Sequence, residues 1–361
     1  MTNKMMPSAK MEVIPFSGIR KVFEAAGKLE KQGREIINLG IGRPNFDTPE
    51  FIKDGAKKAL DDGYTYYTSN YGTEELRQAA ADKFRRDNGL DMNMEDVIVT
   101  VGANQAVSIA MTGLLDSGDE VLVPNPSWLH YFYCAELAGA KTVSYPLLEE
   151  NEFNAQIEDI EKLITPRTKM IIVNTPNNPT GSVLSRESLE RIAQIAKKHN
   201  LIVLSDEIYE KLLYDGSIHT SIASLPDMAE RTIIINGVSK AYAMTGWRIG
   251  FAASKNPAFI SAMIRVLQYT VTCAASVSQY AAEAALTGPQ SCIEEMRVQF
   301  DARRKLVYEE INKIQGLSCI CPKGAFYCFV NIKDLGITDE EASEYYLNEA
   351  GVAMIPGSAF G

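Results

Sequence analysis

The sequence predicts an α/β fold in which a large domain, with a mostly parallel sheet flanked by helices, is joined to a smaller α+β domain. First, 361 residues exceed the size at which a single hydrophobic core stops growing, so two domains are expected. Second, short runs rich in Val and Ile mostly alternate with stretches of helical periodicity, a pattern typical of parallel strands covered on both faces. Third, long helical stretches begin after about residue 256 and lead to one further apolar strand.

The expected strands of the large domain are, in chain order, 97–101, 120–123, 170–173, 201–204, 232–235 and 248–252. Helical periodicity between them is clearest at 106–115 and 184–199. Farther along, the sequence predicts long helices at 257–287 and 291–314 and a strand of the smaller domain at 325–332. We expect the large domain to span 49–275 and the smaller domain to combine 1–48 with 276–361.

Composition excludes several classes of function. The 36 Lys and Arg residues face 46 Asp and Glu residues, and a net charge of -10 offers no basic field to nucleic acid or an anionic membrane. No apolar run approaches membrane-spanning length, and Met1–Lys10 lacks the apolar core of a signal peptide. The six cysteines are dilute and lack metal-type spacing. We expect a cytoplasmic protein without a metal site.

Each of five predicted strands is followed by a segment of polar or small residues: 102–104, 124–128, 174–181, 206–209 and 237–240. Loops at the carboxyl ends of parallel strands are where open α/β sheets bind ligands. The last segment is the most informative, because Lys240 follows an apolar strand between small residues, and Arg248 comes eight residues later. A surface lysine is the commonest reading of any single Lys, but small neighbours would also let a bulky group reach an amine that forms Schiff bases with carbonyl cofactors.

The segment from Gly237 to Gly250 resembles the cofactor-attachment site of class I/II aminotransferases of pyridoxal-phosphate fold type I, particularly the branch of aspartate and aromatic aminotransferases. Further motifs occur in the family's order between Gly40 and Gly361. The resemblance implies a fold-type-I structure with pyridoxal 5'-phosphate held by Lys240. It also implies ping-pong transamination between an L-amino acid of aspartate, aromatic or alanine type and a 2-oxo acid such as 2-oxoglutarate, with Lys240 as the acid/base.

The resemblance assigns roles to three residues around the cofactor ring. Asp206 would pair with the protonated pyridine nitrogen, although an aspartate at a strand end is also a common helix N-cap. Tyr209 would donate to the phenolic oxygen of the ring, or else be a core tyrosine. Asn178 would contact the same oxygen and the substrate carboxylate, whereas the Asn174–Gly181 series alone reads as a turn.

The phosphate site is expected where the helix after Val101 begins, because the N–H groups of Gly102, Ala103 and Asn104 can bind an anion there. A plain turn is the alternative. By resemblance, Ser239 and Arg248 add side-chain contacts, and Tyr67 reaches this phosphate from the second subunit of a homodimer. Gly237 stands where the family often has a serine, so one hydroxyl contact is missing.

Two further residues complete the expected site by resemblance. Trp128 would stack on the pyridine ring, and the backbone of Gly42 would lie near the substrate carboxylate. A core tryptophan and a turn glycine are the plain alternatives. Asn104 replaces a lysine found in some related aspartate enzymes, so strict dicarboxylate specificity is not expected.

Relatives carry an arginine that clamps the substrate's α-carboxylate shortly after a segment like Pro356–Gly361, and no arginine follows Arg304 here. We therefore expect the sequence to be a truncated version. Two other functions remain open. The first is a C–S β-lyase using the same cofactor, because a lyase and a transaminase share their early reaction steps and the sequence distinguishes them poorly. The second is a cofactor-sensing regulator. The regulator is disfavoured because the matched region begins near Gly40, which leaves no room for a DNA-binding domain.

Overall fold

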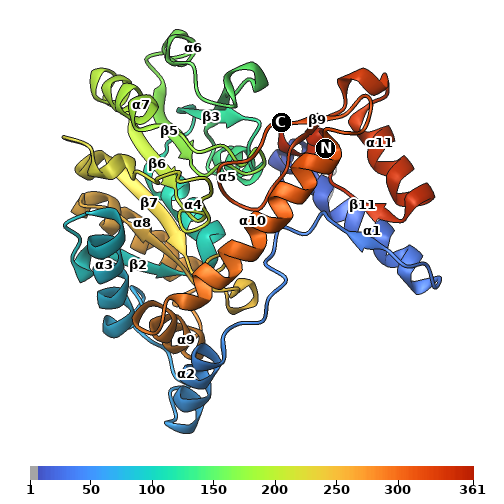
Figure 1. Ribbon diagram of the computed structural model, residues 1–361. Coiled ribbons are helices and arrows are strands. Elements are labelled where there is room, and N and C mark those ends of the chain that lie inside the picture. The colour runs from blue at the N-terminus through green and yellow to red at the C-terminus, as the bar shows by residue number, and fades with distance from the viewer. Residues whose placement is uncertain (1–6) are drawn as a thin grey trace, which may run out of the picture.

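The computed structural model describes residues 7–361, and its centre is a seven-stranded sheet in the order β2-β8-β7-β6-β5-β3-β4 (Figure 1). The strands are β2 Val97–Thr100, β3 Glu120–Asn125, β4 Lys141–Pro146, β5 Thr168–Asn174, β6 Ile202–Asp206, β7 Thr232–Gly237 and β8 Gly250–Ala253. Within this sheet β8 is antiparallel to both neighbours, and the other pairings are parallel. The predicted α/β class is confirmed. Most of Met1–Lys10 lies outside the described residues.

Strands buried on both faces account for the continuous apolar runs of the sequence. Every residue of β2, β7 and β8 is buried, so neither face of these strands needs polar residues. The strand β4 was not predicted, because it lies at the edge of the sheet and exposes Lys141 and Ser144. Its mixed sequence therefore lacks the Val/Ile signal.

Helices cover both faces of the sheet (Figure 1). One face packs against α4 Gly102–Leu114, α5 His130–Leu137 and α8 Pro257–Thr270. The other face packs against α6 Ile157–Lys162 and α7 Arg186–Lys198 and, toward β2, against α2 Glu50–Asp61, α3 Glu74–Asn88 and α9 Ser276–Thr287. Neighbouring residues of β2 serve opposite faces: Ile98 packs with α4, whereas Val97 and Val99 pack with α3. This alternation is the period-2 geometry of a strand.

The structure corrects three predicted boundaries. The stretch 257–287 is two helices, α8 and α9, because the chain turns between them through Thr272 at φ +73°. The strand predicted at 325–332 is reduced to β10 Val330–Asn331, and Ala325 has φ +57°. The strand predicted from residue 248 begins at Gly250, because Arg248 is left-handed at φ +57°. Apolar composition does not reveal such local backbone reversals.

The N-terminal arm and the C-terminal segment pack together. β1 Ile37–Asn38 pairs in parallel with β11 Val352–Ala353, and α1 Gly18–Lys31 lies beside them with α11 Asp339–Tyr345 nearby (Figure 1). A second small sheet joins β9 Ser318–Cys319 to β10, and the long helix α10 Ser291–Ile311 precedes it. The division at residues 275 and 276 stays a prediction. Over residues 7–361, no helix has both the length and the apolar character to cross a membrane.

Candidate active site

The direction of β8 explains how distant residues meet at one edge of the sheet. Because β8 is antiparallel to its neighbours, its first residues lie at the edge where β2 and β7 end. A cavity of about 290 Å³ lies there. The predicted site residues that line it are Gly42, Ala103, Asn104, Trp128, Asn178, Asp206, Tyr209, Ser239, Lys240 and Arg248.

Two predicted residues are not part of this lining. Gly102 lies directly behind it, since a Cβ there would come 2.3 Å from a guanidinium nitrogen of Arg248. Tyr67 is 87% exposed and lies outside the lining of the cavity in its own chain. A larger cavity of about 880 Å³, next to α1 and α11, shares Asn104 and Trp128 with the first but is lined by neither Lys240 nor Asp206. The reactive groups therefore belong to the smaller cavity.

Lys240 follows β7 and points its amine into the cavity. Its Nζ donates a hydrogen bond to the carbonyl oxygen of Gly42 at 2.5 Å and lies 5.6 Å from the ring centres of Tyr209 and Phe326. Burial is the main reason why the pKa of Lys240 is lowered to about 8; the Asp206 carboxylate opposes this shift, and the Arg248 charge adds to it. A substantial fraction of this amine is therefore neutral, and thus nucleophilic, near neutral pH.

Asp206 ends β6 with its carboxylate buried. Tyr131 donates to Oδ2 at 2.7 Å, and the backbone N–H of Ile208 donates to Oδ1 at 3.2 Å. Burial raises the pKa of Asp206 to about 6, while these two hydrogen bonds partly offset the rise. Sequence reasoning missed Tyr131, because it lies within the apolar helix α5 and has no local motif. A cation placed in the cavity near this carboxylate would be favoured.

Tyr209 contacts a second tyrosine that sequence reasoning also missed. The hydroxyls of Tyr209 and Tyr327 form a hydrogen bond; Tyr209 is buried and Tyr327 is partly buried. A Cβ on Gly42 would come 2.9 Å from the Tyr327 hydroxyl, so glycine permits the arm to approach this pair closely. The arm, the sheet edge and the C-terminal part thus each contribute one of these residues to the wall.

Asn178 carries an unusual polar atom. Its backbone N–H donates to Oδ1 of Asn174 at 2.9 Å, but its own side-chain Oδ1 is buried without a hydrogen-bond partner. Leaving a buried acceptor unpaired costs about 1–3 kcal/mol. Because Asn178 lines the cavity, a bound group that presents a donor there would remove this cost.

The start of α4 forms a cradle of backbone around Arg248. The guanidinium donates to the carbonyls of Thr245 at 3.1 Å and Val101 at 3.4 Å, and Gly102 leaves it room at φ +77°. The exposed N–H groups of a helix start and an adjacent arginine suit a phosphate. Together with the buried amine and the unpaired amide oxygen of Asn178, this cradle fits an aldehyde cofactor that carries a phosphate.

Trp128 forms one side wall of the cavity. Its ring stacks on His130 at 4.5 Å and meets Tyr131 edge-on at 5.5 Å, so its orientation is fixed by packing. A planar ligand could lie against its other face.

Comparison with known proteins decides the family. Residues 34–361 match the model of the family described as aminotransferase class I and II. The chain is 47% identical over 360 residues to aromatic-amino-acid aminotransferase 2 of Thermococcus litoralis, covering 99% of this chain and 91% of that protein. It is equally similar to an aspartate aminotransferase of Pyrococcus abyssi. The chain belongs to the class I and II aminotransferases.

Solved structures support the same family. The aspartate aminotransferase of Thermus thermophilus with maleate superposes with a TM-score of 0.94 at 40% identity over 98% of this chain and 92% of that one. An alanine aminotransferase of Pyrococcus furiosus gives 0.93 at 37% identity, over 99% and 92% of the two chains. This aminotransferase is thus a transaminase that uses pyridoxal phosphate, with the fold-type-I architecture. The comparisons support this function and not the β-lyase.

Replacing Gly250 by Ala is expected to damage the cradle of this aminotransferase. A Cβ at this position would come 2.5 Å from the backbone N of Ala103, which cannot move without displacing the start of α4. We expect the free energy of unfolding to fall by about 1–3 kcal/mol, as for other overpacked sites, and the affinity for pyridoxal phosphate to fall with it. Urea denaturation and absorbance titration measure the two effects.

The matched control is Gly246→Ala, since a Cβ at Gly246 meets no atom within 4 Å. This variant should keep the wild-type free energy of unfolding and the wild-type affinity for pyridoxal phosphate. Equal behaviour of the two variants would show that the close approach at Gly250 is not restrictive.

Proposed function

We propose that this aminotransferase binds pyridoxal phosphate in the 290 Å³ cavity through a covalent imine link to Lys240 and uses the same amine as its acid/base. The observation that carries the proposal is the buried Lys240 amine, with a pKa of about 8, in one cavity with the buried Asp206 carboxylate. Perturbed ionisable groups that share a cavity are typical of catalytic sites.

The other contacts with the cofactor follow from the position of each group. Asp206 pairs with the ring nitrogen, Tyr209 and Asn178 contact the phenolic oxygen, and Trp128 lies against the ring. The place of Asn178 in the cavity lining and the fixed orientation of Trp128 support these assignments. The proposed phosphate ligands are Gly102, Ala103, Asn104, Ser239 and Arg248.

Bound pyridoxal phosphate supplies a carbonyl that condenses with amines and a ring that accepts electrons from the substrate's α-carbon. The chain supplies the rest. Asp206, a carboxylate above pH about 6, stabilises positive charge at the ring nitrogen. Nζ of Lys240, once displaced by the substrate amine, takes the α-proton of the amino acid, and its lowered pKa suits this transfer near neutral pH.

For the substrate, we propose aromatic as well as acidic L-amino acids, with 2-oxoglutarate as the amino-group acceptor. The relatives bear the names of aromatic, aspartate and alanine aminotransferases. The uncharged Asn104 at the cavity wall supports breadth, because this position adds no charge that would select for a second carboxylate. Gly42, Trp128 and Asn178 are the proposed substrate contacts. Spectral titration with single amino acids, without an acceptor, would rank the substrates, and a response to aspartate alone would reject breadth.

We also propose a homodimer in which Tyr67 reaches the phosphate of the neighbouring site. Tyr66 and Tyr67 are 83% and 87% exposed on one loop, which supports contact with a second chain. In analytical ultracentrifugation the chain should sediment as a dimer, and Tyr67→Phe should bind pyridoxal phosphate less tightly. A monomer that binds the cofactor normally would contradict the proposal.

The cytoplasm remains the expected location from the composition of the sequence.

The test of the proposed function is reduction with borohydride followed by peptide mapping. The chain loaded with pyridoxal phosphate should carry the reduced cofactor on Lys240. The rate at which cofactor-free chain attaches the cofactor should rise with pH to a plateau above about 8, because the neutral amine is the nucleophile. Attachment at other lysines, or a midpoint near that of an ordinary lysine, would overturn the assignment.

A further inference from the structure

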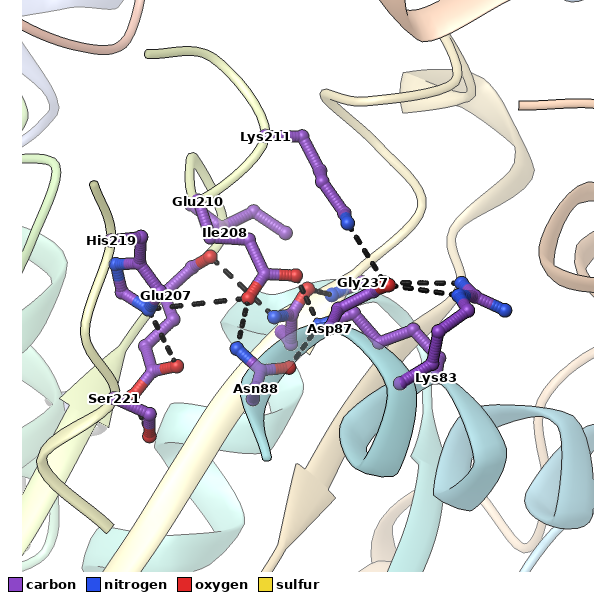
Figure 2. Close-up of polar contacts among 12 residues, drawn as sticks. Lys83, Asp87, Asn88, Glu207, Ile208, Glu210, Lys211, His219, Ser221 and Gly237 are labelled. Atoms are coloured by element: carbon purple, nitrogen blue, oxygen red, sulfur yellow. Dashed lines mark hydrogen bonds and ion pairs between the residues drawn. The ribbon is translucent and has the colours of Figure 1, made fainter. Parts of the chain in front are cut away.

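A buried group of charged and polar side chains lies beside the segment that follows β6 (Figure 2). The buried polar cluster consists of Lys83, Asn88, Glu207, Glu210 and His219. The side chains of its four ionisable members are at most 7% exposed, and Glu207 is fully buried. So many ionisable groups are rarely buried unless their contacts are used.

One half of the buried polar cluster joins β6 to the helix α3. Lys83 forms an ion pair with Oε1 of Glu210 and donates to Oδ1 of Asn88 at 2.9 Å. The amide of Asn88 donates in turn to Oε2 of Glu210 at 2.6 Å. Each carboxylate oxygen of Glu210 therefore has a partner from the end of α3 (Figure 2).

The other half surrounds Glu207. Its Oε1 accepts from the hydroxyls of Ser205 at 2.9 Å and Ser221 at 2.7 Å, and its Oε2 lies 2.9 Å from Nε2 of His219. The same nitrogen lies 4.0 Å from Glu210. Burial acts to lower the pKa of His219, but the carboxylates of Glu207 and Glu210 outweigh it and raise the pKa. Two carboxylates thus face the Lys83 ammonium and the His219 imidazole, whose protonated form they favour.

The acidic residues could also suggest a metal site, since ligand atoms of Glu207, Glu210 and His219 lie within 4.8 Å of one another. The contacts argue against it, because the ammonium of Lys83 already pairs with Glu210 and Nε2 of His219 already pairs with Glu207. The chain supplies its own hydrogen-bond and ion-pair partners to these carboxylates. The role of the buried polar cluster must therefore come from the segment of the chain that it holds in place.

The cluster is attached to the turn that carries two proposed cofactor ligands. Asp206 and Tyr209 line the cavity, whereas Glu207 and Glu210, from the same turn, enter the buried polar cluster. The turn is thus held from behind at two points while its other two side chains face the site. Groups that hold active-site residues from outside commonly fix their orientation to within a fraction of an ångström.

We propose that the buried polar cluster is a positioning device that holds Asp206 and Tyr209 in the geometry required by pyridoxal phosphate. The inference rests on the proposed function, since it takes these two residues as cofactor ligands. His219 is the member to test, because it comes from a separate loop and forms its hydrogen bond to the turn with Glu207.

The experiment compares His219→Leu and His219→Gln with wild type. The leucine variant removes the donor to Glu207, whereas glutamine can still donate without the charge. We expect His219→Leu to bind pyridoxal phosphate about tenfold more weakly, the size that loss of outer hydrogen-bond partners has at metal sites. The pH midpoint of the visible absorption band should also shift upward, because a displaced Tyr209 donates less well to the phenolic oxygen. His219→Gln should recover part of both effects.

The control is the same pair of substitutions at His199. This residue directly follows α7 and lies outside the cavity lining, and its Nε2 lies 3.1 Å from a carboxylate oxygen of Glu161. Both His199 variants should match wild type in affinity and in midpoint. The proposal is overturned if His219→Leu lowers only the melting temperature of the cofactor-free chain and keeps the wild-type affinity and midpoint. Should this variant fail to fold, Glu207→Gln, which keeps an acceptor for Ser205 and Ser221, replaces it with the same expected shifts.

Failure of the proposed function would look different. If wild type itself forms no borohydride-reducible link at Lys240, the roles of Asp206 and Tyr209 fail, and the inference falls with them. If wild type forms the link with a normal band and the His219 variants leave that band unchanged, the proposed function stands and only the positioning role is wrong.

Discussion

Replacing Lys240 by Ala is expected to lower multiple-turnover transamination by about 10⁴-fold or more, because one side chain is both the covalent anchor and the proton carrier. The fold should persist. Lys240 has its amine in the cavity, bonded to the carbonyl of Gly42, so its removal takes away a desolvated amine rather than core packing. Steady-state kinetics and circular dichroism of the same preparation measure the two outcomes, and borohydride should no longer fix the cofactor.

The matched control is Lys323→Ala. Lys323 is an exposed lysine whose amine pairs with Glu152 at 2.6 Å, so the substitution removes the same charge from the surface. Exposed ion pairs contribute about 0–1 kcal/mol, and activity should remain normal. Turnover of Lys240→Ala within tenfold of wild type would mean that another group carries the proton.

Much of the large domain was predictable because its chemistry is local. Buried parallel strands require unbroken apolar runs, and their carboxyl ends require small or polar residues, so β5, β6 and β7 and the loops after them can be read from composition. The edge strand β4 lacks this requirement. The antiparallel direction of β8, which brings Arg248 to the cavity, depends on the path of the chain rather than on any local pattern.

The residues of the site also fall into those that the sequence predicted and those that it did not. Lys240, Asp206 and Asn178 occur in segments that follow predicted strands, the family resemblance supplied the expected roles of Asp206 and Asn178, and the structure brings all three to one cavity. Tyr131 and Tyr327 were missed, since a tyrosine in an apolar stretch gives no sign that its hydroxyl is used.

The buried polar cluster was missed for a related reason. Lys83 and Glu210 are far apart in sequence, so nothing local pairs them. The Asp-Glu pair at residues 206 and 207 was the one available signal, because two adjacent acids at the end of a buried strand both need partners.

Replacing Asp206 by Asn is expected to lower turnover by about 10²–10³-fold, the usual size for loss of one preorganised electrostatic contact. The same substitution should stabilise the cofactor-free chain. Because burial raises the pKa of Asp206 from 3.8 to about 6, folding favours its protonated form. That contribution to stability is complete below pH 3.8 and is lost as pH rises through about 6, so at pH 8 the wild-type chain bears the cost of a buried carboxylate. Asparagine removes a cost of about 3 kcal/mol.

The opposite signs of these two effects are what make the test specific. A substitution that merely disturbs packing lowers stability and activity together. A buried carboxylate whose role is to pair with the ring nitrogen should instead destabilise the cofactor-free chain, and binding of the cofactor should offset this cost. Urea denaturation of cofactor-free wild type and Asp206→Asn at about pH 4 and pH 8 should show the gain chiefly at pH 8, because the cost builds up between pH 3.8 and about 6. Tyr131→Phe is the companion variant: it removes a donor that lowers the pKa of Asp206, so that pKa should rise further and the stability cost should persist. If Asp206→Asn destabilises the chain equally at both pH values, Asp206 acts as a structural residue, and the pairing with the ring nitrogen loses its physical support.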